Sequence, residues 1–273
     1  MSDVELAIAA DQISERVWLY VHYDCNLSCA YCLSGSTPMS KRRQLSSARL
    51  LELADEAKSL GFKALGVTGG EPFLRRWMVD TLVEMAARLP VLVLTNGTLF
   101  AGKRLAAMAP LASAAVTVQM SLDRLDPGAN DDLRAKGNHA AVVQAITALI
   151  ELGIRVRVAS TLDDLAEDLA FLAFVRGLGV AEEDHILRPI VRRGRAVDTD
   201  MGVRATLSDF RPELTISADG AFWGPFGPTV RDERVDTDLL LCRSTRPLAV
   251  PAGRLIALAR GLPSGHDTTL GIR

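Results

Sequence analysis

The amino-acid sequence predicts an α/β protein built on a parallel sheet. Six strand-like runs alternate with helix-like segments between residues 17 and 190, which is the pattern of successive strand–helix units. These runs are apolar nearly throughout, as expected for strands that are buried on both faces. The chain has 273 residues, 48% of them hydrophobic, so it can bury the large core that such a sheet requires.

The predicted elements follow in order from the amino terminus. The first strand, residues 17–23, is rich in β-branched and aromatic residues and leads into a cysteine-containing loop. A helix over residues 46–60 follows and stops at Gly61, a residue suited to the left-handed position after a helix. The other predicted strands cover residues 64–68, 91–95, 115–122, 155–161 and 185–190. The other predicted helices cover residues 76–88, 103–108, 140–152 and 165–178.

The alternation stops near residue 192, where Gly, Pro and Arg become more frequent. Two short apolar segments, residues 214–218 and 221–223, flank Asp219-Gly220, a dipeptide typical of a tight hairpin turn. We therefore expect three parts. These are an N-terminal extension (1–16), the main α/β domain (17–196) and a small C-terminal α+β appendage (197–273).

Charge and hydropathy give no reason to expect nucleic acid or a membrane as a partner. The 31 Lys and Arg residues nearly balance 33 Asp and Glu residues, whereas phosphate binding needs a concentrated basic surface. The N-terminal segment has acidic residues where a secretory signal has basic ones. No apolar run approaches the roughly 20 residues of a membrane-spanning helix. We therefore expect a cytoplasmic protein, whose four cysteines serve metal binding or catalysis before disulfides.

Three of the cysteines, Cys25, Cys29 and Cys32, lie on one short loop and can converge on a single metal centre. A cubane iron–sulfur cluster with three cysteine ligands keeps one iron open for another molecule, whereas a structural zinc site is normally closed by four ligands. His22 could supply a fourth ligand. A non-catalytic zinc or iron–sulfur protein in a structural or sensing role is therefore an alternative.

Three further segments close successive predicted strands. They are Gly69-Gly70-Glu71-Pro72, Thr95-Asn96-Gly97-Thr98 and Ser121-Leu122-Asp123. With the CxxxCxxC loop ahead of them in this order, residues 18–196 resemble the radical S-adenosylmethionine (SAM) superfamily. The resemblance implies a partial (β/α)6 TIM-like barrel. It also implies a [4Fe–4S] cluster that the three cysteines bind and whose open iron binds SAM.

The resemblance further implies which side chains surround SAM. Glycines allow the backbone a close approach, and the Glu71 carboxylate would bind the SAM ammonium with that backbone. Asn96 and Ser121 suit hydrogen bonds to the ribose hydroxyls or the carboxylate, and Tyr31 would lie beside the adenine. Arg134, Arg157 or both could pair with the carboxylate, because guanidinium binds carboxylate through two parallel hydrogen bonds. The full expected set is Tyr31, Gly69, Gly70, Glu71, Asn96, Ser121, Asp123, Arg134 and Arg157.

The implied reaction begins with an electron from a reductant such as flavodoxin or ferredoxin. SAM is then cleaved, and a 5′-deoxyadenosyl radical abstracts hydrogen from an unactivated C–H bond. Residues 187–196, ending in Gly194-Arg195-Ala196, resemble the GRA segment of peptide-modifying and cofactor-maturing branches. This segment favours a peptide substrate in natural-product maturation, with a small metabolite as the alternative.

The C-terminal region resembles the hairpin of SPASM domains, which carry some seven further cysteines for auxiliary clusters. Only Cys242 remains here, so we expect a degenerate appendage without an auxiliary cluster. The same lack argues against the GTP cyclase of molybdenum cofactor synthesis, which the front half resembles. The aromatic residues Phe222, Trp223 and Phe226 are candidates for covering the site.

Overall fold

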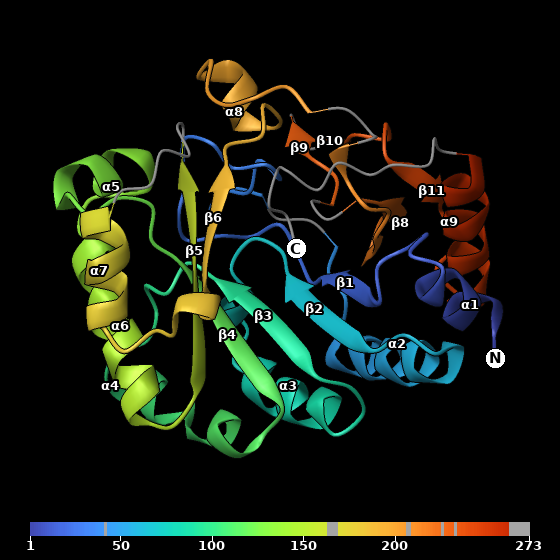
Figure 1. Ribbon diagram of the computed structural model, residues 1–273, viewed down its shortest axis with the longest axis horizontal. Coiled ribbons are helices and arrows are strands. Elements are labelled where there is room, and N and C mark those ends of the chain that lie inside the picture. Colours follow the sequence, from blue (N-terminus) through green and yellow to red (C-terminus); the bar gives the residue numbers. More distant parts are fainter. Residues whose placement is uncertain (41–42, 163–168, 206–208, 225–226, 232–233, 262–273) are drawn as a thin grey trace.

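A nine-stranded sheet forms the centre of the computed structural model, which describes residues 1–40, 43–162, 169–205, 209–224, 227–231 and 234–261 (Figure 1). The strand order is β11-β8-β7-β1-β2-β3-β4-β5-β6. Strands β1 to β6 are parallel and neighbour one another in chain order, with helices in the connections. The predicted parallel α/β sheet is confirmed, and its arrangement is that of a partial (β/α)6 barrel.

The described elements agree with most predicted ones to within a few residues. The parallel strands are β1 (Arg16–Tyr20), β2 (Ala64–Thr68), β3 (Val91–Thr95), β4 (Val116–Ser121), β5 (Arg155–Leu162) and β6 (His185–Pro189). The helices among them are α2 (Ser47–Leu60), α3 (Met78–Ala86), α4 (Gly102–Ala106), α5 (Pro127–Leu133), α6 (Asn138–Glu151) and α7 (Leu169–Gly177). The helix predicted over residues 165–178 corresponds to α7, and the first four residues of that prediction lie outside the described residues. The predicted first strand ends early, at Tyr20, so His22 lies in the loop that follows.

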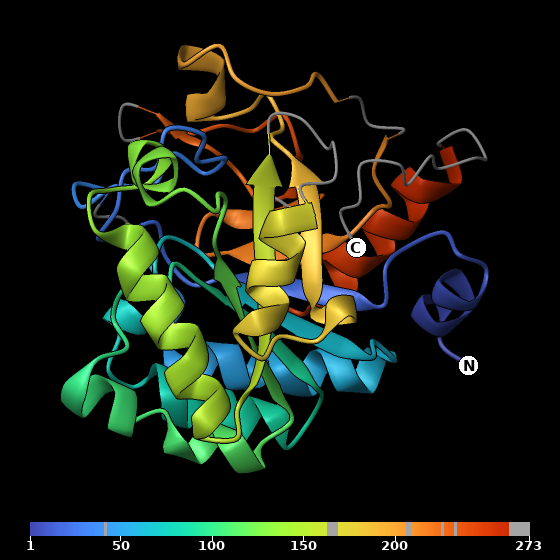
Figure 2. The same ribbon diagram turned by 60° about the vertical axis from the view of Figure 1, so that its left-hand side comes forward.

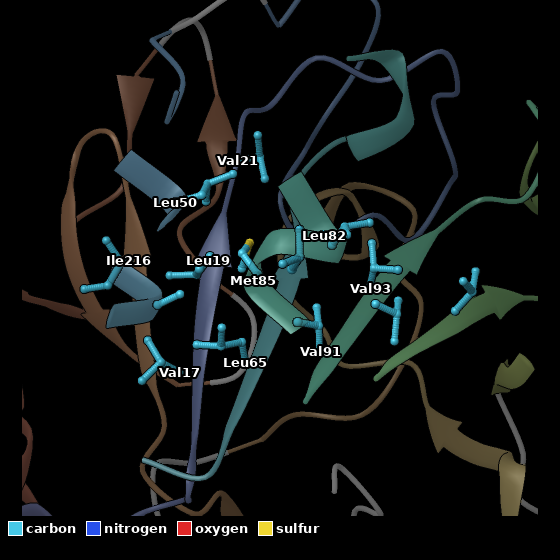
Figure 3. Close-up of a cluster of buried hydrophobic side chains, with 14 of the residues drawn as sticks. Val17, Leu19, Val21, Leu50, Leu65, Leu82, Met85, Val91, Val93 and Ile216 are labelled. Carbon is cyan, nitrogen blue, oxygen red and sulfur yellow. The ribbon is translucent and has the colours of Figure 1, made fainter. Parts of the chain in front are cut away.

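The main hydrophobic core lies between the sheet and its helices (Figure 3). Val17, Leu19 and Val21 alternate along the chain and join this core, where Leu50 of α2 and Met85 of α3 also pack. Because successive side chains of a strand point to opposite faces, the residues between them face the inside of the sheet. This period of two is what turns Trp18 and Tyr20 toward the cavity described below.

The C-terminal strands extend the same sheet. Strand β7 (Leu214–Ser217) pairs in parallel with β1, β8 (Gly220–Trp223) is antiparallel to β7, and β11 (Leu240–Cys242) is antiparallel to β8. The hairpin was predicted correctly, but Ser217 pairs with Gly220, so the turn is Ala218-Asp219, one residue earlier than expected. Gly220 instead accommodates the approach of β11, because a Cβ at this position would lie 2.8 Å from the Cys242 carbonyl oxygen.

Two of the three aromatic residues proposed to cover the site belong to the core. Phe222 and Trp223 are buried in β8 within the main hydrophobic cluster. Their apolar surface is therefore used in packing, which corrects the expectation of a lid. Phe226 lies outside the described residues.

Helix α1 (Asp3–Ala9) was missed, although the sequence carries a signal for it. The Ser2 side chain accepts a hydrogen bond from the Glu5 amide and the Glu5 carboxylate accepts one from the Ser2 amide, which is a capping box. The helix packs beside α9 (Ala249–Gly261), which was not predicted either, like the short helices α5 and α8 (Arg195–Asp198) (Figures 1 and 2). Helix α8 lies beyond the end of β6 (Figure 1), and the remaining short strands are β9 (Val230–Arg231) and β10 (Arg234–Val235). Among the described helices, none combines the length and apolar character needed to cross a membrane.

His185, the first residue of β6, makes stability depend on pH. Its Nε2 lies 2.9 Å from Ser160 Oγ, and burial lowers the pKa of His185 to about 4. The unfolded chain therefore takes up a proton first as pH falls. The contribution of the neutral His185 ring to the free energy of unfolding is complete above about pH 6.5 and is lost as pH falls toward 4. Because solvent partly screens this half-buried ring, we expect wild type to lose about 1 kcal/mol more free energy of unfolding between pH 7 and pH 5 than His185→Gln, which keeps a donor for Ser160.

Chemical denaturation of both proteins at the two pH values measures this difference. Ser160 Oγ donates to the Leu122 carbonyl oxygen, so the neutral ring acts as the donor to Ser160. An identical loss of stability in both proteins would show that another group is responsible.

Candidate cofactor site

The three clustered cysteines line a cavity of about 240 Å³ at the carboxyl ends of the parallel strands. Residues from the ends of β2, β3, β4, β5 and β6 complete its wall. Of the residues expected to surround SAM, those that line the cavity are Tyr31, Gly69, Gly70, Asn96, Ser121 and Arg134. Segments as distant in the chain as the cysteine loop and the end of β6 therefore meet here, because parallel strands end at one edge of a sheet.

The Gly194-Arg195-Ala196 segment holds the cysteine loop in place. The Arg195 amide donates to the Cys32 carbonyl oxygen at 3.0 Å. The Arg195 side chain donates from Nε to the Cys29 carbonyl oxygen at 2.8 Å and from a terminal nitrogen to the Ser36 carbonyl oxygen at 2.9 Å. The sequence drew attention to this segment only by resemblance, and its role as a clamp appears only in the folded chain.

The thiols of the cysteine loop suit binding to a cationic iron centre. Burial raises the pKa of Cys25 to about 12 and also raises that of Cys29, so without a metal these groups stay protonated. Iron replaces such protons, and thiolates are stabilised by nearby donors. Three lie near the sulfurs of the described residues: Leu27 N is 3.4 Å and Asn96 Nδ2 3.8 Å from Cys25 Sγ, and Ser34 Oγ is 3.4 Å from Cys32 Sγ. The donor set fits a cluster with three cysteine ligands.

A zinc site completed by His22 is the alternative to this cluster. Within the part of the chain that the structure describes, no three His, Cys, Asp or Glu side chains are placed to hold one metal ion. A cluster has no such need, because each cysteine binds a different iron. His22 is buried, and neither ring nitrogen has a hydrogen-bond partner among the described residues.

Gly69 and Gly70 bring the end of β2 against the loop that follows β1. The Gly70 amide donates to the His22 carbonyl oxygen at 2.7 Å. A Cβ at Gly70 would lie 2.0 Å from the Asp24 carbonyl oxygen, and one at Gly69 would lie 2.4 Å from that of His22. Only glycine permits this contact, whereas the expected approach of the same backbone to SAM stays a prediction.

Glu71 is fully buried, and its carboxylate joins the ends of β2 and β3. Its oxygens accept hydrogen bonds from the Phe73 amide at 3.0 Å, the Asn96 amide at 2.8 Å and the Thr95 hydroxyl at 2.9 Å. Burial raises the pKa of Glu71 to about 7 despite these donors. Its side chain therefore positions the Asn96 segment, and direct contact with the SAM ammonium stays a prediction.

The Asn96 side chain is oriented by its neighbours. Its amide nitrogen donates to Asn26 Oδ1 at 2.9 Å and lies 3.8 Å from Cys25 Sγ. Its oxygen accepts from the Thr98 amide at 3.0 Å. These contacts connect the third strand's end directly to the cysteine loop. Ser121 ends β4 and lines the cavity, and its contact with SAM stays a prediction.

Tyr31, Asp123 and Arg134 form a buried polar cluster. The Tyr31 hydroxyl donates to Asp123 Oδ2, and Arg134 Nε donates to the same oxygen at 2.6 Å. An Arg134 terminal nitrogen donates to the Tyr31 oxygen at 2.7 Å. Asp123 Oδ1 accepts from the Thr161 amide at 2.9 Å. Asp123 is thus fully engaged by protein donors, and it orients Tyr31 and Arg134 in the cavity wall.

Breaking this cluster should cost stability. Asp123→Asn would leave the buried Arg134 guanidinium without its carboxylate, and we expect the free energy of unfolding to fall by about 3–5 kcal/mol. Chemical denaturation measures this change. Asp132→Asn, on the exposed side of α5, should lie within about 0.5 kcal/mol of wild type. Equal stability of the two variants would rule out a structural role for the Asp123 charge.

Arg157 lies outside the described wall of the cavity, unlike the expectation. It comes four residues before Thr161, the β5 residue that does line the cavity, which places it roughly 13 Å along the strand. Its Nε lies 3.4 Å from Asp184 Oδ1, and Asp184 also pairs with Arg155. Of the two arginines expected to bind the SAM carboxylate, only Arg134 reaches the site.

Comparison with known proteins places this geometry in context. The family model of the radical SAM superfamily matches residues 19–164. GTP 3′,8-cyclase of Streptomyces coelicolor is 35% identical over 157 residues, covering 53% of this chain and 45% of the cyclase. Mycofactocin maturase MftC of Mycolicibacterium smegmatis is 28% identical over 232 residues, covering 83% of this chain and 51% of the maturase. The chain spans about half the length of the curated relatives it matches.

Among solved structures, the fold resembles SuiB of Streptococcus suis. SuiB bound to S-adenosylmethionine gives a TM-score of 0.54 at 16% identity, covering 66% of this chain and 41% of SuiB. SuiB bound to the precursor peptide SuiA gives a TM-score of 0.53 at 16% identity, covering 69% and 43%. At this identity the likeness concerns the fold.

Proposed function

Because this chain belongs to the radical SAM superfamily, whose members use a [4Fe–4S] cluster and SAM, we propose that it is an enzyme that cleaves SAM reductively. The main support for this proposal is that the three cysteines line one cavity together with Gly69, Gly70 and other residues at the strand ends. In this proposal Cys25, Cys29 and Cys32 hold the cluster. When bound, the cluster and SAM supply an electron transfer and a radical that takes a hydrogen atom from the substrate.

The chain's own residues would position SAM and keep water from it. The backbone of Gly69 and Gly70 offers close contact, while Asn96 and Ser121 present hydrogen-bonding groups to the cavity. Arg134, held by Asp123, would bind the SAM carboxylate with a terminal nitrogen. The ring of Tyr31, fixed through its hydroxyl, would face the adenine.

We propose a peptide as the substrate, modified in natural-product maturation. SuiB, whose fold this chain resembles, has been solved with a precursor peptide, and MftC is named as a maturase. A small metabolite is the second candidate, since GTP 3′,8-cyclase is named for a nucleotide reaction and the cavity is small. A flavodoxin or ferredoxin would deliver the electron.

The test does not need the substrate. The protein is reconstituted anaerobically with iron and sulfide, reduced with dithionite, and examined by electron paramagnetic resonance with and without SAM. A cluster signal that changes when SAM is added supports the open iron and the proposed reaction. A signal indifferent to SAM, or bound zinc without a cluster, would overturn the proposal in favour of a structural or sensing metal protein.

A further inference from the structure

A second group of charged residues faces the same cavity. Arg188, near the end of β6, lines it together with Trp18 of β1 and Glu213, the residue before β7. None of these three belongs to the residues expected to surround SAM. The parallel pairing of β7 with β1 brings Glu213 beside Trp18, whose indole Nε1 donates to the Glu213 carboxylate.

The Arg188 guanidinium lacks a partner of opposite charge. Among the described residues, no carboxylate oxygen lies within 4 Å of it, and its buried Nε has no hydrogen-bond partner. Within the described part of the chain, the Arg188 side chain makes one hydrogen bond, a long one of 3.4 Å to Gln119 Oε1. Burial, with the nearby Arg157 and Arg16 charges, lowers the pKa of Arg188 to about 10, so the group stays cationic at neutral pH.

The charged groups around Arg188 do not balance its positive charge. Arg16 lies over the Trp18 ring, 5.3 Å from its centroid, and likewise has no ion pair among the residues that the structure describes. Glu213 is the one carboxylate whose charge favours both Arg16 and Arg188, while Arg157 pairs with Asp184. Glu213 is thus the one carboxylate whose charge favours Arg188, and the two form no ion pair; a largely desolvated guanidinium without such a partner is unfavourable unless an anion joins it.

We propose that Arg188, with Arg16 behind it, binds an oxyanion of the substrate, a carboxylate or a phosphate. Guanidinium offers a planar pair of donors that matches either group. The SAM carboxylate already has a candidate partner in Arg134, so the anion at Arg188 belongs to the second molecule in the cavity. The inference rests on the proposed function and narrows its substrate class.

Thermal unfolding of the reconstituted, SAM-saturated protein tests the site with simple anions. Glutarate and inorganic phosphate are compared with KCl at equal ionic strength. We expect one of them to raise the unfolding midpoint by about 2–4 °C in wild type. Arg188→Gln should lose this shift, and Arg188→Lys, which keeps the charge without the planar pair of donors, should lose more than about half of it. Arg176→Gln, which removes an exposed ion pair on α7, should keep the full shift.

The two anions separate the possible sources. A response to glutarate indicates a carboxylate, such as an acidic side chain or the carboxyl terminus of a peptide, and a response to phosphate indicates a phosphorylated molecule. In KCl alone Arg188→Gln should be at least as stable as wild type, because it removes an unpaired buried charge. A lower midpoint in KCl would instead assign Arg188 a structural role and overturn the proposal.

Two other results would also overturn it. These are no shift beyond KCl with either anion and an undiminished shift in Arg188→Gln. The electron paramagnetic resonance change on adding SAM is recorded on the same preparation. If that change is absent, the proposed function itself fails, and if it is present without an anion response, only the oxyanion site fails.

Discussion

Cys29→Ala is expected to abolish cluster binding and SAM cleavage while leaving the fold intact. The cluster would have three protein ligands and no spare one, and the Cys29 carbonyl oxygen would stay anchored by Arg195 in the variant. Loss of an outer-shell partner alone typically costs 10–100-fold at metal sites, so loss of a ligand should reduce 5′-deoxyadenosine formation by more than about 100-fold. Iron content after reconstitution and chromatography of 5′-deoxyadenosine measure both effects.

Cys242→Ala is the matched control. The Cys242 thiol lies in β11, where its sulfur donates to the Ser244 carbonyl oxygen at 3.2 Å, and it does not line the cavity. This variant should retain wild-type iron content and activity. If instead Cys29→Ala kept four irons per chain, or Cys242→Ala lost them, the assignment of the ligands to the cysteine loop would be wrong.

Gly194→Ala is expected to cause the second-largest loss, although residue 194 is distant in sequence from the cysteines. Gly194 has φ +61° and ψ −132°, a conformation that side-chain-bearing residues adopt only at a cost of about 1–3 kcal/mol. A Cβ would lie 2.3 Å from both the Cys32 and the Leu33 carbonyl oxygens. The cysteine loop must then shift, and we expect iron content and 5′-deoxyadenosine formation to fall by about 10-fold.

Gly253→Ala provides the comparison. A Cβ at Gly253 would have no atom within 4 Å, and the residue lies in α9, where alanine is favoured over glycine by about 1 kcal/mol. This variant should keep its cluster and gain stability. Circular dichroism of Gly194→Ala should remain close to wild type, and a normal cluster in that variant would show that the loop is not held by this contact.

The order of strands and helices could be predicted because it is written in local periodicity. Apolar runs identified all six parallel strands, and residues such as Gly61, which ends the helix before the second strand, marked where one element gives way to the next. The two terminal helices were missed, since α1 is short and was treated as an extension, although Ser2 and Glu5 mark its start. The placement of β7 beside β1 was also missed, because strand pairing between distant segments has no local signature.

The candidate site divides in the same way. Cys25, Cys29, Cys32, Gly69 and Gly70 could be identified from spacing and order, and all of them line the cavity. For side chains chosen by their chemistry alone, the sequence did not predict well which ones line the cavity. Arg157 has the right chemistry but lies too far along its strand, while Arg188, on the neighbouring strand, lines the cavity and was overlooked.

The sequence by itself determined the family, the parallel sheet and the cysteine loop. These depend on residues close together in the chain or on motifs in a fixed order. Only the tertiary structure decided that Gly194 and Arg195 hold the cysteine loop, that Asp123 holds Arg134, and that Arg188 faces the cavity without an ion pair to a described residue. These arrangements arise where strand ends and loops meet in space, and only folding decides which charged side chains are desolvated and which of them find a partner.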